Sequence, residues 1–280
     1  MPPPEVTIRR IVVAMDNTAT AGHALDAAID LAARLQAELE GLFVEDETLM
    51  RVAELNLGRT FNMLSGRAQT FDAAAMSAML RGEAARVREA LAAQAARSRV
   101  SHTFRVVRGL MAHELITAAE AADLLVLSLA GRQVGAGMRA APAALAAIER
   151  ARAPVLIVRP GTQLRGRAFV LYDSPDDGAD LLSAAARLIA GADGSLVVLL
   201  VGTDDAAVAE RRARAEADLA RLGLAAGFRR VQTLALDDVC SLLGGADAGV
   251  LVVSARHPLI AGESRASLLE RVACPVLVVR

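Results

Sequence analysis

Short runs of Val, Leu and Ile alternate along the chain with longer Ala-rich runs in which apolar residues recur at helical spacing. This alternation is typical of βαβ units, in which helices connect parallel strands and cover the sheet. We therefore predict ten strands, five in each half of the chain. Those of the first half are 10–14, 42–44, 103–107, 124–128 and 155–158. Those of the second half are 168–172, 196–201, 230–234, 250–254 and 276–279.

The predicted helices lie between these strands. In the segment 20–40, Leu25, Ile29, Ala32 and Leu39 recur at three-, four- and seven-residue spacings. Such spacing places them on one apolar stripe that can lie on a sheet. We therefore expect the first helix to run from 20 to 40.

The second half of the chain repeats the first. Segments 149–159 and 270–280 share seven of eleven residues without a gap. A predicted strand that ends in Asp and one that ends in Ser recur in the same order, at Asp16 and Ser128 and again at Asp173 and Ser254. A repeat of this length predicts two tandem domains, which we place at 1–160 and 161–280 with the linker at 161–166.

The first half is longer than the second, and most of the extra length corresponds to segment 45–80. This insertion has mixed helical and loop character and several methionines, among them Met63, Met76 and Met79. One interpretation is a helical lid that packs over the carboxyl edge of the first sheet and governs what that half binds. The other is a surface for a protein partner or small ligand, because Met-rich surfaces repack around varied partners. The lid would bury the apolar side chains of Leu49, Val52, Leu55, Phe61, Met63 and Leu64.

Several motifs together resemble the universal stress protein family. They are the strand end Val-Ala-Met-Asp-Asn-Thr at 13–18, the second strand Gly-Leu-Phe-Val-Glu-Asp at 41–46, and the closing Ala-Pro-Val-Leu-Ile-Val at 153–158. The resemblance covers nearly the whole chain twice and is weaker in the second half. It implies an α/β fold of two tandem domains of the adenine nucleotide α-hydrolase-like type. Each would be an open five-stranded parallel sheet with helices on both faces.

The resemblance also implies where a nucleotide would bind in the first half. Asp16 and the backbone of Val44 match the family's adenosine contacts. Family members that bind ATP carry Gly-x2-Gly-x9-Gly-Ser/Thr after the fourth strand, so that backbone amides approach the phosphates. The four positions here are Ser128, Gly131, Ala141 and Pro142, of which only Gly131 matches. The loop is therefore degenerate, and Asp16 has the alternative role of capping the next helix.

The second half departs from the same pattern in a different way. Asp173 matches the strand-ending Asp and Gly262 the late glycine, but Glu263 stands where the family has Ser or Thr. A carboxylate at a helix start suits the helix dipole and repels a phosphate. We expect Asp173 to cap a helix or form a turn, and the loop imidazole of His257 to face solvent.

The closing strands 155–158 and 276–279 are rich in Val, Leu and Ile, and such strands pair readily if left at an exposed edge. We predict that they lie side by side and join the halves into an intramolecular pseudo-dimer, as in dimers of the family.

The amino-acid composition excludes some classes of function and argues against others. All 31 cationic side chains are arginine, so a Walker A loop, a Schiff-base enzyme and a pyridoxal-phosphate enzyme are excluded. A net charge of −1 and only 2% aromatic residues argue against nucleic-acid binding. No apolar run is long enough to span a membrane, and no secretory signal is visible, so we expect a cytoplasmic protein. The histidines and the two cysteines, Cys240 and Cys274, form no metal or catalytic motif.

The sequence thus favours a non-catalytic stress-response or regulatory protein that binds no ATP and needs no cofactor. One alternative is a sensor of ATP or AMP that uses Asp16, Val44, Ser128 and Gly131 of the first half, with weak ATPase activity left open. Another is a module that binds a protein partner or small molecule through segment 45–80.

Overall fold

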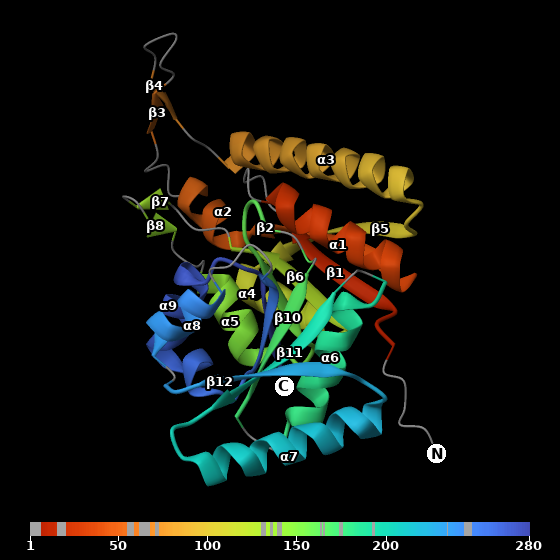
Figure 1. The fold of residues 1–280 in the computed structure, drawn as a ribbon. Helices are drawn as coiled ribbons and strands as arrows, with labels where there is room; N and C mark the ends of the chain where they lie inside the picture. Colours follow the sequence, from red (N-terminus) through yellow and green to blue (C-terminus); the bar gives the residue numbers. More distant parts are fainter. Residues whose placement is uncertain are drawn as a thin grey trace.

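The computed structural model shows one layered α/β body (Figure 1). It describes residues 7–15, 21–54, 59–61, 68–70, 73–129, 133–134, 137–138, 142–162, 164, 166–173, 176–191, 194–233, 235–243 and 248–280. The strands of the main sheet are β1 (Arg10–Met15), β2 (Glu38–Asp46), β5 (His102–Gly109), β6 (Leu124–Ser128), β9 (Val155–Val158), β10 (Arg167–Tyr172), β11 (Ser195–Val201), β12 (Ala226–Val231), β13 (Ala248–Ser254) and β14 (Val276–Val279). The helices are α1 (Ala21–Leu35), α2 (Glu47–Glu54), α3 (Ala73–Ser98), α4 (Met111–Glu120), α5 (Pro142–Arg150), α6 (Gly178–Ile189), α7 (Asp205–Leu222), α8 (Leu236–Leu243), α9 (Gly262–Arg271) and the 3-10 turn η1 (Pro258–Ile260).

All ten predicted strands form, and they join into one sheet in the order β12-β11-β10-β13-β14-β9-β6-β1-β2-β5. Neighbours are parallel within each half, and the two halves have the same internal strand order. β14 and β9 pair antiparallel, with Val276 opposite Ile157 and Leu277 opposite Leu156. The predicted contact between the closing strands is therefore confirmed, whereas the domain boundary at 160/161 stays a prediction.

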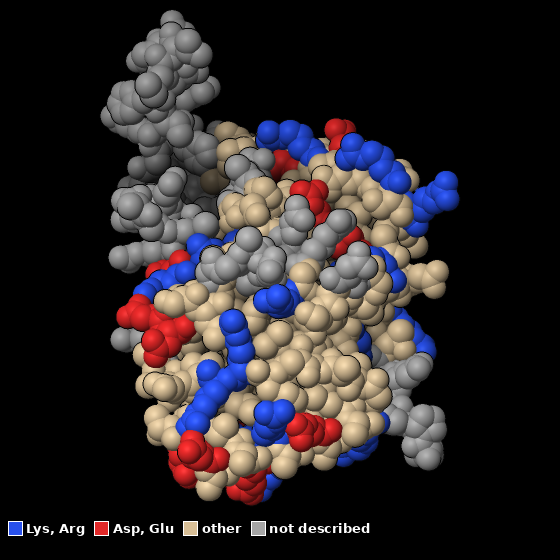
Figure 2. All heavy atoms as spheres, viewed as in Figure 1, with Lys and Arg blue, Asp and Glu red and all other residues tan. Residues whose placement is uncertain are grey.

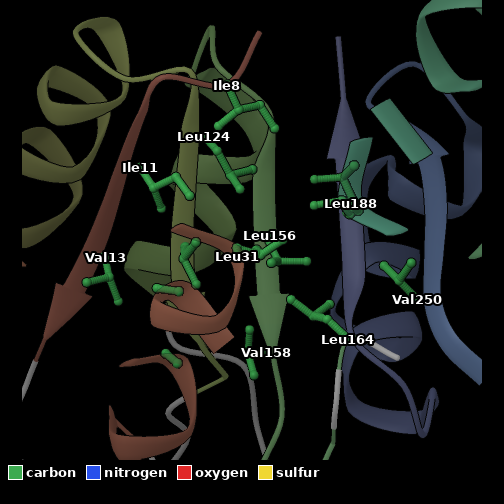
Figure 3. Packing of buried hydrophobic residues seen from close by; sticks show 14 of the residues in the cluster. Ile8, Ile11, Val13, Leu31, Leu124, Leu156, Val158, Leu164, Leu188 and Val250 are labelled. Carbon is green, nitrogen blue, oxygen red and sulfur yellow. The ribbon is translucent and has the colours of Figure 1, made fainter. Parts of the chain in front are cut away.

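Helices cover both faces of the sheet, as the alternating pattern predicts. One face carries α1, α3, α6 and α7, and we call it the α1 face. The other carries α4, α5, α8 and α9, and we call it the α4 face. The core of the α1 face runs unbroken across the β9–β14 junction, since Leu156 of one half and Leu188 and Val250 of the other belong to one buried cluster (Figure 3).

Three predicted boundaries are wrong. β2 begins at Glu38 rather than at 42, because Glu38 and Glu40 interrupt the apolar run on which the prediction of 42–44 rested. α1 ends at Leu35 rather than at 40, because Gln36 adopts a left-handed backbone with φ 53° that stops the helix. Leu39 then belongs to β2, where it pairs with Ile11, so its helical spacing from Leu25 was coincidental. β12 spans Ala226–Val231 instead of 230–234, because its residues alternate between partly buried and exposed along an edge strand and show no continuous apolar run.

Arginine side chains tie the two halves together at helix ends. Arg34 of α1 donates to the carbonyls of Leu188 and Ala190 at the end of α6, at 2.9 and 2.6 Å. Arg159, just after β9, donates to the carbonyls of Leu269, Glu270 and Val272 at the end of α9. These carbonyls have no partner within their own helices, so cross-half donors satisfy them.

The two outermost strands are covered in the same way. On β5, the guanidinium of Arg88 from α3 lies 5.1 Å from the ring centre of Phe104. On β12, that of Arg212 from α7 lies 4.8 Å from the ring centre of Phe228. Such cation–π contacts hold a charged group over an apolar side chain at the rim of the sheet.

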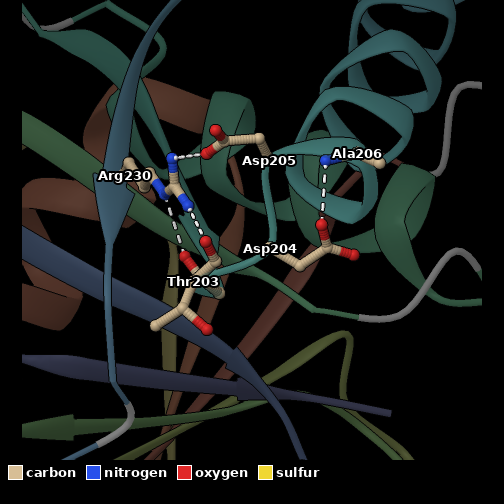
Figure 4. Close-up of polar contacts among 6 residues, drawn as sticks. Thr203, Asp204, Asp205, Ala206 and Arg230 are labelled. Atoms are coloured by element: carbon tan, nitrogen blue, oxygen red, sulfur yellow. Dashed lines mark hydrogen bonds and ion pairs between the residues drawn. The ribbon is translucent and has the colours of Figure 1, made fainter.

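The carboxyl end of β12 is fastened to the loop before α7 (Figure 4). Arg230 donates to the carbonyls of Gly202 and Thr203 and pairs with Asp205. Asp204 caps α7 by accepting from the amide of Ala206 at 3.1 Å. This loop is therefore held by Arg230 of β12 and by its own Asp204, and both contacts stabilise the fold.

Candidate functional site

The strand order places one candidate site in each half. In the first half, the chain moves from β1 outward to β2 and β5 and then returns to β6 on the other side of β1. In open α/β sheets, ligands bind beyond the carboxyl ends of the strands at such a reversal. A pocket of about 120 Å³ lies there, and residues of β1, β2, β6, α4 and α5 line it.

This pocket is mainly apolar. Val44 of β2 is buried and Ser128 ends β6, and both predicted site residues line it. The rest of its wall is formed by Ala14, Met15, Leu42, Met111, Leu115, Leu127, Ala143 and Ala144. The other two predicted residues, Asp16 and Gly131, lie outside the described residues, as does the cap that Asp16 was expected to form.

The helix that points at this pocket begins with a proline. α5 starts at Pro142, and Ala143 and Ala144 contribute to the pocket wall. A helix start offers backbone amides to an anion, and proline has none to give. Pro142 suits the first turn of a helix, but it removes one donor at the place where a phosphate would need it.

The described part of the 45–80 insertion packs elsewhere. Met76 and Leu80 of α3 are buried in the core of the α1 face, and Met50 of α2 packs against that core, 3.9 Å from Ser77. Within the described residues, no residue after Val44 and before Met111 lines the first-half pocket. The side chains predicted to form the lid, Leu49, Val52, Leu55, Phe61, Met63 and Leu64, lie outside the described residues.

The second half has its own pocket at the equivalent reversal, between β10 and β13. Its volume is about 100 Å³, and it is more polar than the first. The side chains around it are Leu171, Asp173, Asp176, Asp177, Leu181, Ser254, Arg256, His257 and Pro258. Asp173 thus lies at this site as the repeat predicts, whereas Gly262 begins α9 with φ 55° and does not line the pocket.

The expectation that His257 faces solvent is wrong. Only 5% of its surface is exposed, and its Nδ1 accepts a hydrogen bond from the amide of Leu259 at 3.1 Å. The imidazole caps η1 in the manner of an Asn or Asp side chain. A His-Pro pair before an apolar segment was the available signal, because Pro258 sets the first residue of the turn.

Asp173 was expected to cap a helix or form a turn; it does not cap α6, and residues 174–175, which such a turn would include, lie outside the described residues. The residue at the start of α6 is Asp177, and its side chain makes no capping hydrogen bond. Asp177 is only 7% exposed, and its Oδ1 has no hydrogen-bond partner among the described residues. No prediction was made for Asp177 from the sequence, because an Asp-Asp-Gly run usually forms an exposed turn.

Burial lowers the pKa of His257, although Asp173 and Asp177 act to raise it. Unfolded histidine titrates near 6.5, so below that pH the unfolded chain binds more protons than the folded one. We therefore expect stability to fall as the pH falls from 6.5 toward the lower folded pKa. Denaturant unfolding of wild type and His257→Asn at pH 7.5 and 5.0 measures this. An equal loss of stability in both proteins would contradict it.

Comparison with known families identifies the fold. The model of the "Universal stress protein family" matches residues 7–159, more than half of the chain. The chain belongs to the universal stress protein family. This membership supports a stress-response-type function. No curated protein matches the chain.

Solved structures agree with this fold. A universal stress protein from Archaeoglobus fulgidus is 16% identical with a TM-score of 0.71, over 97% of this chain and 96% of that one. A putative universal stress protein from Pseudomonas aeruginosa is 18% identical with a TM-score of 0.59, over 99% and 95%. A functionally unknown protein from Pseudomonas aeruginosa is 18% identical with a TM-score of 0.65, over 98% and 93%. The universal stress fold therefore extends over both halves of the chain.

Among the described residues, no three His, Cys, Asp or Glu side chains are grouped to hold a metal, and no helix could cross a membrane. Burial raises the pKa of the Cys274 thiol to about 12, so it is no nucleophile near neutral pH. Three arginines of α7 and β12, Arg212, Arg214 and Arg230, are paired with Glu216, Glu210 and Asp205. Figure 2 shows both signs of charge on one face.

Proposed function

We propose that this chain is a non-catalytic regulatory protein of the stress response whose first half does not bind ATP with useful affinity. The observation that carries the proposal is the start of α5 at Pro142 beside the apolar pocket of the first half. A triphosphate needs amide and hydroxyl donors at this place. Pro142 supplies neither, and Ala141 carries a Cβ where the ATP-binding loop has glycine.

Each lost contact to a charged phosphate weakens binding by roughly 1.5–3 kcal/mol. Two such losses shift a micromolar site to about 0.1 mM or weaker, because 1.4 kcal/mol is a factor of ten. Titration calorimetry with ATP and magnesium should therefore detect no binding tighter than this. A dissociation constant below about 50 µM on the same scale would refute the proposal.

A gain-of-function variant sharpens the test. Ala141→Gly combined with Pro142→Ser restores the loop pattern, so we expect ATP affinity to rise at least about tenfold over wild type. Gly82→Ala in α3, far from the pocket, serves as the matched control and should leave binding unchanged. Equal affinity in the double variant and wild type would show that the loop does not limit binding.

A second candidate is an adenosine or AMP sensor that uses the same pocket. Its support is that Val44 and Ser128 line a cavity with apolar walls, which suits a flat base without needing a triphosphate loop. Titration with AMP beside ATP distinguishes the two. AMP binding at micromolar concentration that Val44→Arg abolishes would favour the sensor.

A further inference from the structure

The second-half pocket between β10 and β13 holds two buried polar atoms that have no hydrogen-bond partner among the described residues. They are Nε2 of His257 and Oδ1 of Asp177. The His257 side chain is 3% exposed and Asp177 is 7% exposed, and both line the pocket. A buried polar group without a partner is costly and needs an explanation. A ligand that pairs with both atoms provides one.

The hydrogen bond at the other ring nitrogen fixes what His257 offers. Because Nδ1 accepts from the amide of Leu259, the proton of the neutral ring is on Nε2. Burial keeps the ring neutral near pH 7 by lowering its pKa. Nε2 therefore donates into the pocket, whereas Oδ1 of Asp177 accepts. Asp173 lies close by, with its Oδ2 3.7 Å from Nε2, and offers a second acceptor.

The charges around the pocket exclude several ligand classes. Asp173, Asp176 and Asp177 line it against the single exposed Arg256, so a phosphate or carboxylate is repelled. The described residues contain no group of three ligands for a metal. An ammonium group would suit the carboxylates but would face the N–H of His257, because Nε2 needs an acceptor.

A hydroxyl group fits both atoms, since it accepts and donates at once. We propose that this pocket binds a small uncharged polyol: one hydroxyl accepts from Nε2 of His257 and donates to Asp177, and a neighbouring hydroxyl donates to Asp173. Leu171 and Leu181 supply apolar wall for the C–H surface of such a ligand. The site is separate from the first-half pocket, so its test does not depend on the result with ATP.

Two variants remove the proposed contacts while sparing the fold. His257→Asn keeps a side-chain acceptor for the amide of Leu259, because Asn is a preferred cap, but lacks Nε2. Asp177→Ala removes the acceptor without removing a helix cap, because this side chain makes no capping bond. Glu210→Gln on the exposed face of α7 is the control, since it also removes a carboxylate.

Saturation-transfer NMR and chemical-shift titration with myo-inositol, glycerol and glucose test the proposal at pH 7.5. We expect at least one polyol to bind wild type, each pocket variant to weaken it at least tenfold, and Glu210→Gln to leave it unchanged. Inorganic phosphate and methylammonium, which has an ammonium group and no hydroxyl, are comparison probes and should not compete. The proposal is wrong if no polyol binds at ligand concentrations up to about 10 mM. It is also wrong if a polyol binds and neither variant weakens the binding, or if either comparison probe competes.

Discussion

Replacing Leu156 by alanine should destabilise the protein by about 2–5 kcal/mol, the range for removing a fully buried leucine. Leu156 is 0% exposed. It pairs with Leu277 across the antiparallel junction of the halves and with Val126 on its other side. Because the Leu156 side chain belongs to the core of the α1 face, the cavity would open between the centre of the sheet and the helices that cover it.

Urea unfolding followed by circular dichroism measures this loss. Leu110→Ala is the matched control, because Leu110 is 52% exposed and its replacement should change stability by less than about 0.5 kcal/mol. A Leu156→Ala protein as stable as the control would show that the junction contributes little to the fold.

Gly178→Ala should destabilise the protein by about 1–3 kcal/mol through overpacking. A Cβ at this position would lie 2.3 Å from Cε2 and 2.6 Å from Cζ of Tyr172. Tyr172 is buried and donates to Asp218 of α7 at 2.9 Å. The ring cannot move away without breaking this hydrogen bond, so the start of α6 must shift instead.

The control substitution, Gly82→Ala, should change the stability of the protein in the opposite direction. Gly82 lies inside α3, and a Cβ there meets nothing within 4 Å. Gly82→Ala should therefore stabilise the protein by about 0.5–1 kcal/mol, because alanine favours the helix. Thermal unfolding of both variants decides the matter, and a Gly178→Ala protein with a raised midpoint would contradict the close contact with Tyr172.

Strands were predictable from the sequence where they are buried on both faces. Runs such as Val276–Val279 are apolar throughout, since helices cover both sides of the sheet. Ala226–Val231 lies at the edge, and its mixed composition resembles a loop. The end of α1 depended on the backbone of Gln36, and a non-glycine residue gives no warning of a left-handed conformation.

The candidate sites were predictable in position and less so in chemistry. Repeat and family pattern placed Val44, Ser128 and Asp173 at the carboxyl ends of their strands. Ser128 ends β6 and Asp173 directly follows β10, whereas β2 continues past Val44 to Asp46; all three line the two pockets. They could not show that His257 folds inward, because its burial depends on a hydrogen bond to Leu259 within a three-residue turn. Nor could they show that Asp177 is buried without a capping bond.

The covered outer strands have a consequence for assembly. A β-sheet grows by adding strands at its edges, and this chain has already used the apolar edges of β9 and β14 on each other. Another copy could extend the main sheet only at β5 or β12, where Arg88 and Arg212 are held over Phe104 and Phe228. Charged groups at such positions discourage edge-to-edge polymerisation. Growth of the main sheet by strand addition is thus disfavoured at both of its ends.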